Sequence, residues 1–186
     1  MRIARHLLAL TASLAASVPA LAQGGRVSIG PLVGSAPGAN LDGARVPTVG
    51  AVADVGLLRV GAIGLHLGGT LEYRAGAQMT GVSASLRAPL FDRLAVRVGA
   101  ATGGAQVQRA SWDERILWRD WRGADVGLEL RLGRTTGALM VRGGTIDGFV
   151  SPPSSCGINI DCALSDAPGN PRGFVRVSFE SRYALF

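Results

Sequence analysis

Beyond residue 25 the sequence alternates between apolar residues and polar or small ones with a period of two. In residues 63–74, for example, Leu65, Leu67 and Tyr73 alternate with His66 and Glu72. Successive side chains of a strand point to opposite faces of a sheet, so this period predicts strands, whereas an amphipathic helix repeats about every 3.6 residues. The pattern covers residues 26–33, 49–57, 63–74, 82–90, 93–100, 125–132, 139–142 and 175–185. We therefore expect an all-β chain of eight strands.

The connections between these segments alternate in length. Short connections are expected at residues 58–59, 91–93 and 133–137, and longer ones at 36–45, 111–122 and 151–172, with a further short one at 75–78. Outer-membrane barrels have short turns at one end and long loops at the other, and an open sheet edge is not tolerated in hydrocarbon. The sequence therefore predicts an eight-stranded antiparallel up-and-down transmembrane β-barrel, with both termini at the short-turn, periplasmic end.

Residues 1–22 have the pattern of a cleaved secretory signal peptide. Arg2 and Arg5 give a basic start, residues 7–21 are apolar, and Ala20-Leu21-Ala22 fits the small-x-small cleavage rule. The apolar run is shorter than the ~20 residues that span a bilayer as a helix. No later stretch has 18 consecutive apolar residues, so no transmembrane helix is expected after cleavage. Residues 23–186 are then one barrel domain.

The polar set of alternating positions is rich in charge and is expected to face the barrel interior. Small eight-stranded barrels are filled by side chains, and arginine pairs with carboxylates through a planar fork. Since the arginines outnumber the acids, some must meet backbone carbonyls, water or the barrel mouth. The expected interior charge network is Arg26, Asp54, Glu72, Arg74, Arg87, Arg97, Glu129, Arg131, Arg142, Arg176, Glu180 and Arg182.

The other set of positions carries Val, Leu, Ile and Ala and is expected to face lipid. Tyr73 and Phe149 lie toward one end of their segments, and Phe91, Tyr183 and Phe186 toward the other, which is consistent with two aromatic girdles. A soluble ligand-binding β-barrel has the opposite arrangement, with its apolar side chains inside. The two arrangements look alike in sequence, so the soluble barrel stays open as an alternative.

The last segment, residues 174–186, alternates and ends in Phe186. It resembles the last strand of bacterial outer-membrane β-barrel proteins, whose assembly signal is an alternating strand that ends in Phe. The size of the chain resembles the small OmpA/OmpX-like eight-stranded class. This resemblance implies insertion by the barrel-assembly machinery and an outer-membrane location in a Gram-negative cell. The residue third from the end is Ala184, where that family often has a large apolar side chain.

The long loops hold two further candidate features. Cys156 and Cys162 are the two cysteines of the chain, and in an oxidising compartment a disulfide is the expected state. Trp112, Trp118 and Trp121 lie in one stretch and are candidate surface contacts for lipopolysaccharide or another partner, since exposed Trp is enriched at binding hot spots. The competing interpretation is an outer aromatic girdle with a packed loop.

No enzyme motif is found, and we expect neither a cofactor nor a metal site. His66 is expected near Ser85 and Arg87, pointing into the barrel, whereas a lipid-hydrolysing site should face the outer leaflet. The net charge of +6 is weak evidence for a nucleic-acid partner, because an exported chain would rarely meet nucleic acid. We therefore expect a non-enzymatic, monomeric outer-membrane protein in contact with lipid and lipopolysaccharide, which serves envelope integrity or surface interaction. A narrow, porin-like channel for ions or small solutes is the other alternative.

Overall fold

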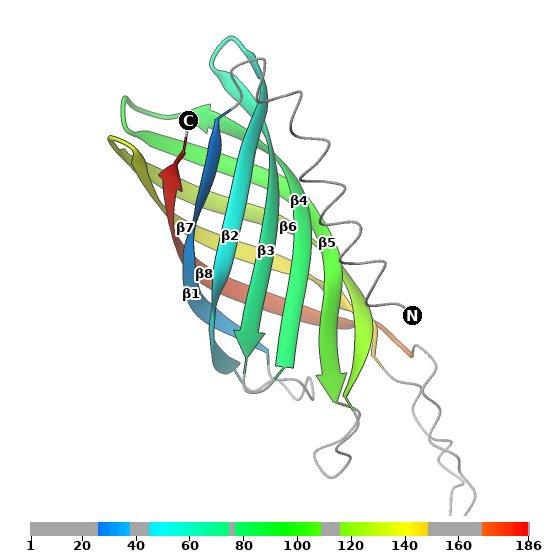
Figure 1. The fold of residues 1–186 in the computed structure, drawn as a ribbon. Coiled ribbons are helices and arrows are strands. Elements are labelled where there is room, and N and C mark those ends of the chain that lie inside the picture. Colours follow the sequence, from blue (N-terminus) through cyan, green and yellow to red (C-terminus); the bar gives the residue numbers. More distant parts are fainter. Residues whose placement is uncertain (1–25, 38–44, 75–76, 109–115, 149–168, 186) are drawn as a thin grey trace, which may run out of the picture.

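The computed structural model describes residues 26–37, 45–74, 77–108, 116–148 and 169–185. These residues form one closed, antiparallel up-and-down barrel in which each strand pairs with the next and β1 pairs with β8 (Figure 1). The strands are β1 (Val27–Pro37), β2 (Arg45–Val60), β3 (Ile63–Arg74), β4 (Ala77–Pro89), β5 (Leu94–Gln108), β6 (Ile116–Leu132), β7 (Thr135–Ile146) and β8 (Arg172–Ala184). The expected all-β, eight-stranded barrel is confirmed. Within the described ranges, no helix is long and apolar enough to span a membrane.

Several strands are longer than the alternation predicted. β6 begins at Ile116 rather than near residue 125, and β5 continues to Gln108 rather than ending near residue 100. Their backbone pairing is continuous from Leu94↔Leu130 to Gln108↔Ile116. The outward positions on the β5 extension are polar or small, and on β6 the exposed Asp120 and Arg122 interrupt the apolar outward positions, so the apolar signal stops before the hydrogen-bonded ladder does.

The three short turns lie at one end of the barrel. Gly61–Ala62 joins β2 to β3, residues 90–93 join β4 to β5, and Gly133–Arg134 joins β6 to β7 (Figure 1). Gly61 and Gly133 have φ angles of 59° and 65°, a region that glycine occupies at little cost. The start of β1 and the end of β8 meet at this same end, where Ser28 pairs with Ala184. We refer to it as the short-turn end, and to the opposite one as the long-loop end.

The turn between β2 and β3 lies further along the chain than the expected 58–59. The register of this strand pair shifts between Gly56 and Leu58, which leaves Leu57 as the extra residue of a β-bulge. A bulge places two successive residues opposite one, so it interrupts strict alternation. The interruption looked like the end of a strand, although β2 continues to Val60.

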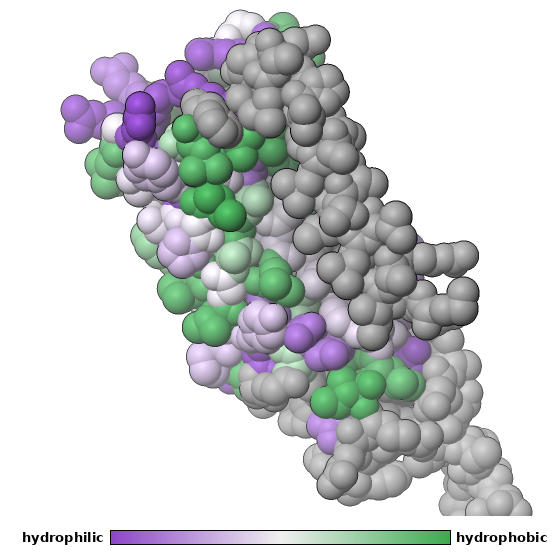
Figure 2. Space-filling model, in the orientation of Figure 1, coloured by the Kyte–Doolittle hydropathy of each residue, from purple (hydrophilic) through white to green (hydrophobic). Residues whose placement is uncertain are grey.

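The two faces of the wall differ sharply in polarity. Outward side chains such as Leu86, Val98 and Phe179 are about half exposed, whereas the inward Arg97 is 4% exposed. Figure 2 shows apolar side chains over the visible described part of the wall, and hydrophilic ones gathered around the short-turn end. Along most of the described strands, apolar positions therefore face out and charged positions face in, as expected; Asp120, Arg122 and Arg131 on β6 are exposed exceptions.

An apolar cluster fills the lumen toward the long-loop end. It consists of Met79, Ala101, Ala105, Val107, Trp121, Ile146 and Phe174. The rings of Trp121 and Phe174 meet edge to face, with centroids 5.9 Å apart. Gly81 makes room for this cluster, because a Cβ atom at Gly81 would lie 2.4 Å from Cζ2 of Trp121. The lumen is thus divided into an apolar part and a charged part.

The packing of Trp121 over Gly81 can be tested with a single added methyl group. We expect Gly81→Ala to lower the free energy of unfolding by about 1–3 kcal/mol, because overpacking forces side chains or backbone to shift. The matched control is Gly69→Ala on the outer face of the neighbouring strand, where a Cβ would meet nothing closer than 4.0 Å. Denaturant unfolding in detergent measures both. Equal stability of the two variants would contradict the packing described here.

Candidate functional site: the charged lumen

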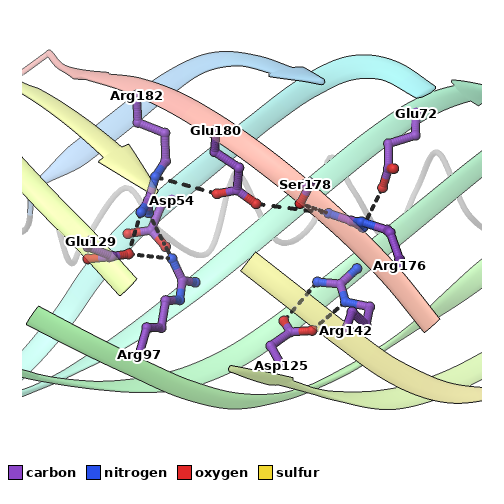
Figure 3. A network of polar contacts seen from close by, with 10 residues as sticks. All are labelled: Asp54, Glu72, Arg97, Asp125, Glu129, Arg142, Arg176, Ser178, Glu180 and Arg182. Atoms are coloured by element: carbon purple, nitrogen blue, oxygen red, sulfur yellow. Dashed lines mark hydrogen bonds and ion pairs between the residues drawn. The ribbon is translucent and has the colours of Figure 1, made fainter. Parts of the chain in front are cut away.

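Four charged side chains meet across the lumen in its short-turn half (Figure 3). Oδ2 of Asp54 on β2 lies 2.7 Å from Nη1 of Arg97 on β5 and 3.5 Å from Nη1 of Arg182 on β8. Arg182 also donates a hydrogen bond to Glu129 on β6, and Nη1 of Arg97 lies 3.5 Å from the same carboxylate. Because β2, β5, β6 and β8 are spread around the barrel, these bonds connect separate parts of the wall through its centre.

Two side chains extend this group toward the short-turn mouth. Oδ1 of Asp54 is hydrogen-bonded to Nδ1 of His66 at 2.8 Å, and Nε of Arg87 lies 2.6 Å from Oε2 of Glu129. Arg87 is 28% exposed, whereas Glu129 is 3% exposed at its side chain. Arg87 therefore lies at the boundary between the buried charges and the solvent at the mouth.

A second group of ion pairs lies toward the long-loop half (Figure 3). Arg176 on β8 donates to Glu72 on β3, and its Nη2 donates to Oγ of Ser178 at 3.0 Å. Arg142 on β7 donates twice to Asp125 on β6, once through Nη2 to Oδ2 at 2.8 Å. The second pair is bidentate and joins neighbouring strands, whereas the first one crosses the lumen.

Glu180 connects the two groups. Its carboxylate lies 3.6 Å from Nε of Arg182 and 3.9 Å from Nη2 of Arg176. The side chains of these ion pairs are nearly fully buried, except for His66 and Arg87 near the mouth. Ionised groups are costly to bury without partners, so the dense pairing explains how a closed wall can enclose them.

Arg74 shows how one of the surplus arginines is satisfied. It is 1% exposed and donates to the backbone carbonyls of Pro37 at 2.7 Å and Gln106 at 2.9 Å. The expectation that some arginines meet backbone carbonyls is confirmed at this residue. The two acceptors belong to β1 and β5, so Arg74 links three strands near the long-loop end.

Of the twelve residues predicted to form the interior network, ten are buried or half-buried with a polar partner within the barrel. The other two, Arg26 and Arg131, are exposed at the short-turn mouth, and among the described residues neither is ion-paired with a carboxylate of the lumen. Their positions have inward parity, but they lie where the barrel opens. Asp125 and Ser178 are part of the network and were missed. Asp125 lies on the same strand as Glu129, four residues before it, so both side chains face the same side. This shared parity could have identified Asp125 as an interior residue from the sequence.

Trp121 is a correction to the predicted surface contacts. Its side chain is 1% exposed inside the barrel, where Nε1 donates to the carbonyl oxygen of Thr80 at 2.9 Å. The guanidinium carbon of Arg142 lies 4.8 Å from its ring centroid, a cation–π distance. Trp121 belongs to β6 with the inward parity of Asp125, so the stretch read as a loop is a strand here. Trp118 has the opposite parity and is half-buried.

His66 on β3 is paired directly with Ser85 on β4, whereas the expected position was one step away from Ser85 and near Arg87. They do not have the arrangement of a base and a nucleophile. Nδ1 of His66 is bonded to Asp54, and Oγ of Ser85 accepts a hydrogen bond from Nε of Arg97 at 2.8 Å. Both side chains therefore serve the charged network.

Several predicted features lie outside the described residues. These are the signal peptide, the Cys156–Cys162 disulfide, Trp112, Phe149 and the terminal Phe186. They stay predictions. Comparison with known proteins adds no further assignment, since neither protein-family models nor curated proteins gave a match. The charged lumen and the two-faced wall are therefore the features from which function is argued.

The cross-lumen pair of Glu72 and Arg176 can be tested by removing one partner. We expect Glu72→Gln to lower the free energy of unfolding by about 3–5 kcal/mol, because it leaves Arg176 buried without its carboxylate. The double variant Glu72→Gln with Arg176→Met should recover much of that loss, since it removes both charges. Tryptophan fluorescence during denaturant unfolding in detergent reports the stability of each variant.

The control for this pair is Asp92→Asn, which removes a carboxylate from an exposed turn. It should change stability by less than about 0.5 kcal/mol. The described pairing would be contradicted if Glu72→Gln were as harmless as Asp92→Asn, or if the effects of the two lumen substitutions simply added.

Proposed function

We propose that this chain is an integral β-barrel protein of the bacterial outer membrane, that it is not an enzyme, and that it serves envelope integrity or surface interaction. The observation that carries the proposal is the inverted polarity of the wall. A chain folding in water buries apolar side chains and exposes charged ones, whereas this barrel does the reverse around most of its circumference. Hydrocarbon is the solvent in which that arrangement is stable.

The apolar surface has the height expected for a membrane span. On β6 the outward Val126, Leu128, Leu130 and Leu132 are 44–57% exposed. The stretch from 124 to 132 rises about 3.4 Å per residue and, at a tilt of about 45°, covers roughly 20 Å along the barrel axis, close to the ~25 Å apolar band of outer-membrane barrels. Beyond it, the outward side chains are Arg122 and Asp120, both exposed.

Aromatic side chains lie near the borders of this surface. Tyr73 is outward on β3 near the long-loop end, and Tyr183 is outward on β8 near the short-turn end, each about half exposed. Phe91 lies in the turn between β4 and β5 and is 73% exposed. This supports interfacial anchoring, because amphipathic aromatic rings favour the headgroup level.

The alternatives have less support. A soluble barrel that binds an apolar ligand needs an apolar cavity, whereas the central lumen here is filled by ion pairs. A channel needs a continuous wet path, whereas Asp54, Glu72, Arg97, Arg176 and Arg182 are joined across the lumen. We therefore propose a structural or surface-contact role over transport, with outer-membrane lipid and lipopolysaccharide as the surroundings of the wall.

The membrane proposal is tested by placing one charge at different depths of the wall. We expect Leu128→Arg, in the middle of the apolar stretch, to lower the free energy of folding into phosphatidylcholine vesicles by about 2–4 kcal/mol. Leu132→Arg, at the short-turn border, should cost only about 0–1 kcal/mol. Both positions are comparably exposed. Equal and small effects would contradict a lipid-facing wall, because water tolerates arginine at either position.

The closed lumen predicts a further electrical result. Purified wild-type protein in planar bilayers should give flat current recordings at moderate voltage, because the paired side chains occupy the path. The double variant Arg97→Ala with Arg182→Ala removes two bridging arginines and should allow measurable steps if it inserts. Steady conductance in the wild type would contradict the structural role and favour the channel.

A further inference from the structure

The short-turn mouth of the barrel contains two adjoining hollows. They have volumes of about 390 and 250 Å³. Both are lined by Arg26, His66, Arg87 and Arg131, so they are two lobes of one depression, which we call the mouth hollow. The larger lobe extends toward the turns that follow β2 and β4, and the smaller one toward the turn that follows β6.

The mouth hollow carries a surplus of positive charge. Across its two lobes it is lined by seven arginines and by three carboxylates, a formal difference of 7 − 3 = +4. Five of these arginines are exposed: Arg26, Arg59, Arg93, Arg131 and Arg134. Among the described residues, no carboxylate pairs with Arg26, Arg93 or Arg134. This differs from the buried lumen, where the charges are closely matched.

The two carboxylates on the floor of the mouth hollow are already neutralised. Asp54 is held by His66, Arg97 and Arg182. Glu129 is held by Arg87 and Arg182. The third carboxylate, Asp92, is on an exposed turn. The floor therefore does not compensate the arginines of the rim, and their charge is available to a ligand.

The arginines that the two lobes share have donors left to offer. Nε of Arg131 donates a hydrogen bond to the carbonyl oxygen of Gly133 at 3.3 Å, within the same turn. Nδ1 of His66 is hydrogen-bonded to Asp54. Its Nε2 faces Gly64, since a Cβ atom added at Gly64 would lie 3.1 Å from Nε2. Gly64 also lines the larger lobe, so this ring edge faces the hollow. The absence of a side chain at Gly64 keeps the space above the imidazole open.

We propose that the mouth hollow is a binding site for a phosphate-class anion, held by Arg26 and Arg131 above Arg87 and His66. A planar guanidinium donates two parallel hydrogen bonds to phosphate oxygens, and several guanidiniums around one hollow favour a multivalent anion over a single carboxylate. The phosphate can belong to a soluble phosphate ester or to a lipid headgroup. The site goes beyond the proposed membrane role and does not depend on it, because it rests on side chains at the mouth and not on the outer wall.

The first experiment titrates inorganic phosphate into the full protein, folded in a zwitterionic detergent at low ionic strength, by isothermal calorimetry. We expect saturable binding that weakens as salt rises, because the attraction is between exposed charges. Arg26→Gln and Arg131→Gln should each weaken binding about tenfold or more, since each removes charge-assisted hydrogen bonds. The control is Arg122→Gln, an exposed arginine on the outer face near the long-loop end, which should bind as the wild type does.

A second arm identifies the source of the phosphate. Phosphatidic acid is added to phosphatidylcholine nanodiscs that contain the protein, and its phosphorus resonance is followed by NMR. Broadening that depends on Arg26 and Arg131, without saturable binding of inorganic phosphate, supports a lipid headgroup as the ligand. Saturable binding of inorganic phosphate with the same dependence supports a soluble ester. Both results support the site.

The proposal is overturned if neither probe binds. It is also overturned if the Arg26→Gln and Arg131→Gln variants bind as tightly as the wild type. Gel mobility without heating checks that every variant is folded, so a loss of binding cannot be confused with a loss of fold. A normal mobility shift without phosphate binding would mean that the mouth site fails while the barrel itself is formed. Failure of the mouth site is therefore distinguishable from failure of the membrane proposal.

Discussion

The ion pairs across the lumen are the interactions on which the rest of the structure depends. Closing eight strands removes every sheet edge, but it also encloses one complete face of the sheet. In this chain that face carries Asp54, Arg97, Glu129 and Arg182, whose burial is tolerated because each is bonded to an opposite charge from another strand. With the polar face inside, the apolar residues are left on the outside, and this determines the surroundings in which the barrel is stable.

The lumen changes character along its axis. Trp121 and Phe174 belong to an apolar cluster toward the long-loop end, the middle is a matched set of charges, and the short-turn mouth has more arginine than carboxylate. The same residue type therefore has three roles. Arg97 neutralises carboxylates, Arg74 binds backbone carbonyls, and Arg131 faces the open hollow. The position of an arginine along the barrel axis therefore decides which of these roles it has.

The fold and much of the network could be predicted because alternation records which face a side chain occupies. Parity alone separated the buried Glu72 and Arg176 from the exposed Val175 and Phe179. It could not pair Glu72 with Arg176, since contacts across the lumen depend on the stagger of the strands. Parity also failed where the pattern was interrupted, at the bulge of Leu57 and on the first half of β6, where Asp120 and Arg122 face outward and Trp121 was interpreted as part of a loop. Arg26 and Arg131 show a further limit, because parity does not report where the barrel ends.

The most direct test of the inverted wall is the mobility of the protein on an SDS gel, with and without heating, in the separated membrane and soluble fractions of the cells that produce it. We expect the protein in the outer-membrane fraction, with the unheated form at a different apparent mass from the heated one, because a closed barrel resists SDS until it is boiled. Recovery in the soluble fraction without a mobility shift would contradict a lipid-facing wall stabilised by paired charges within.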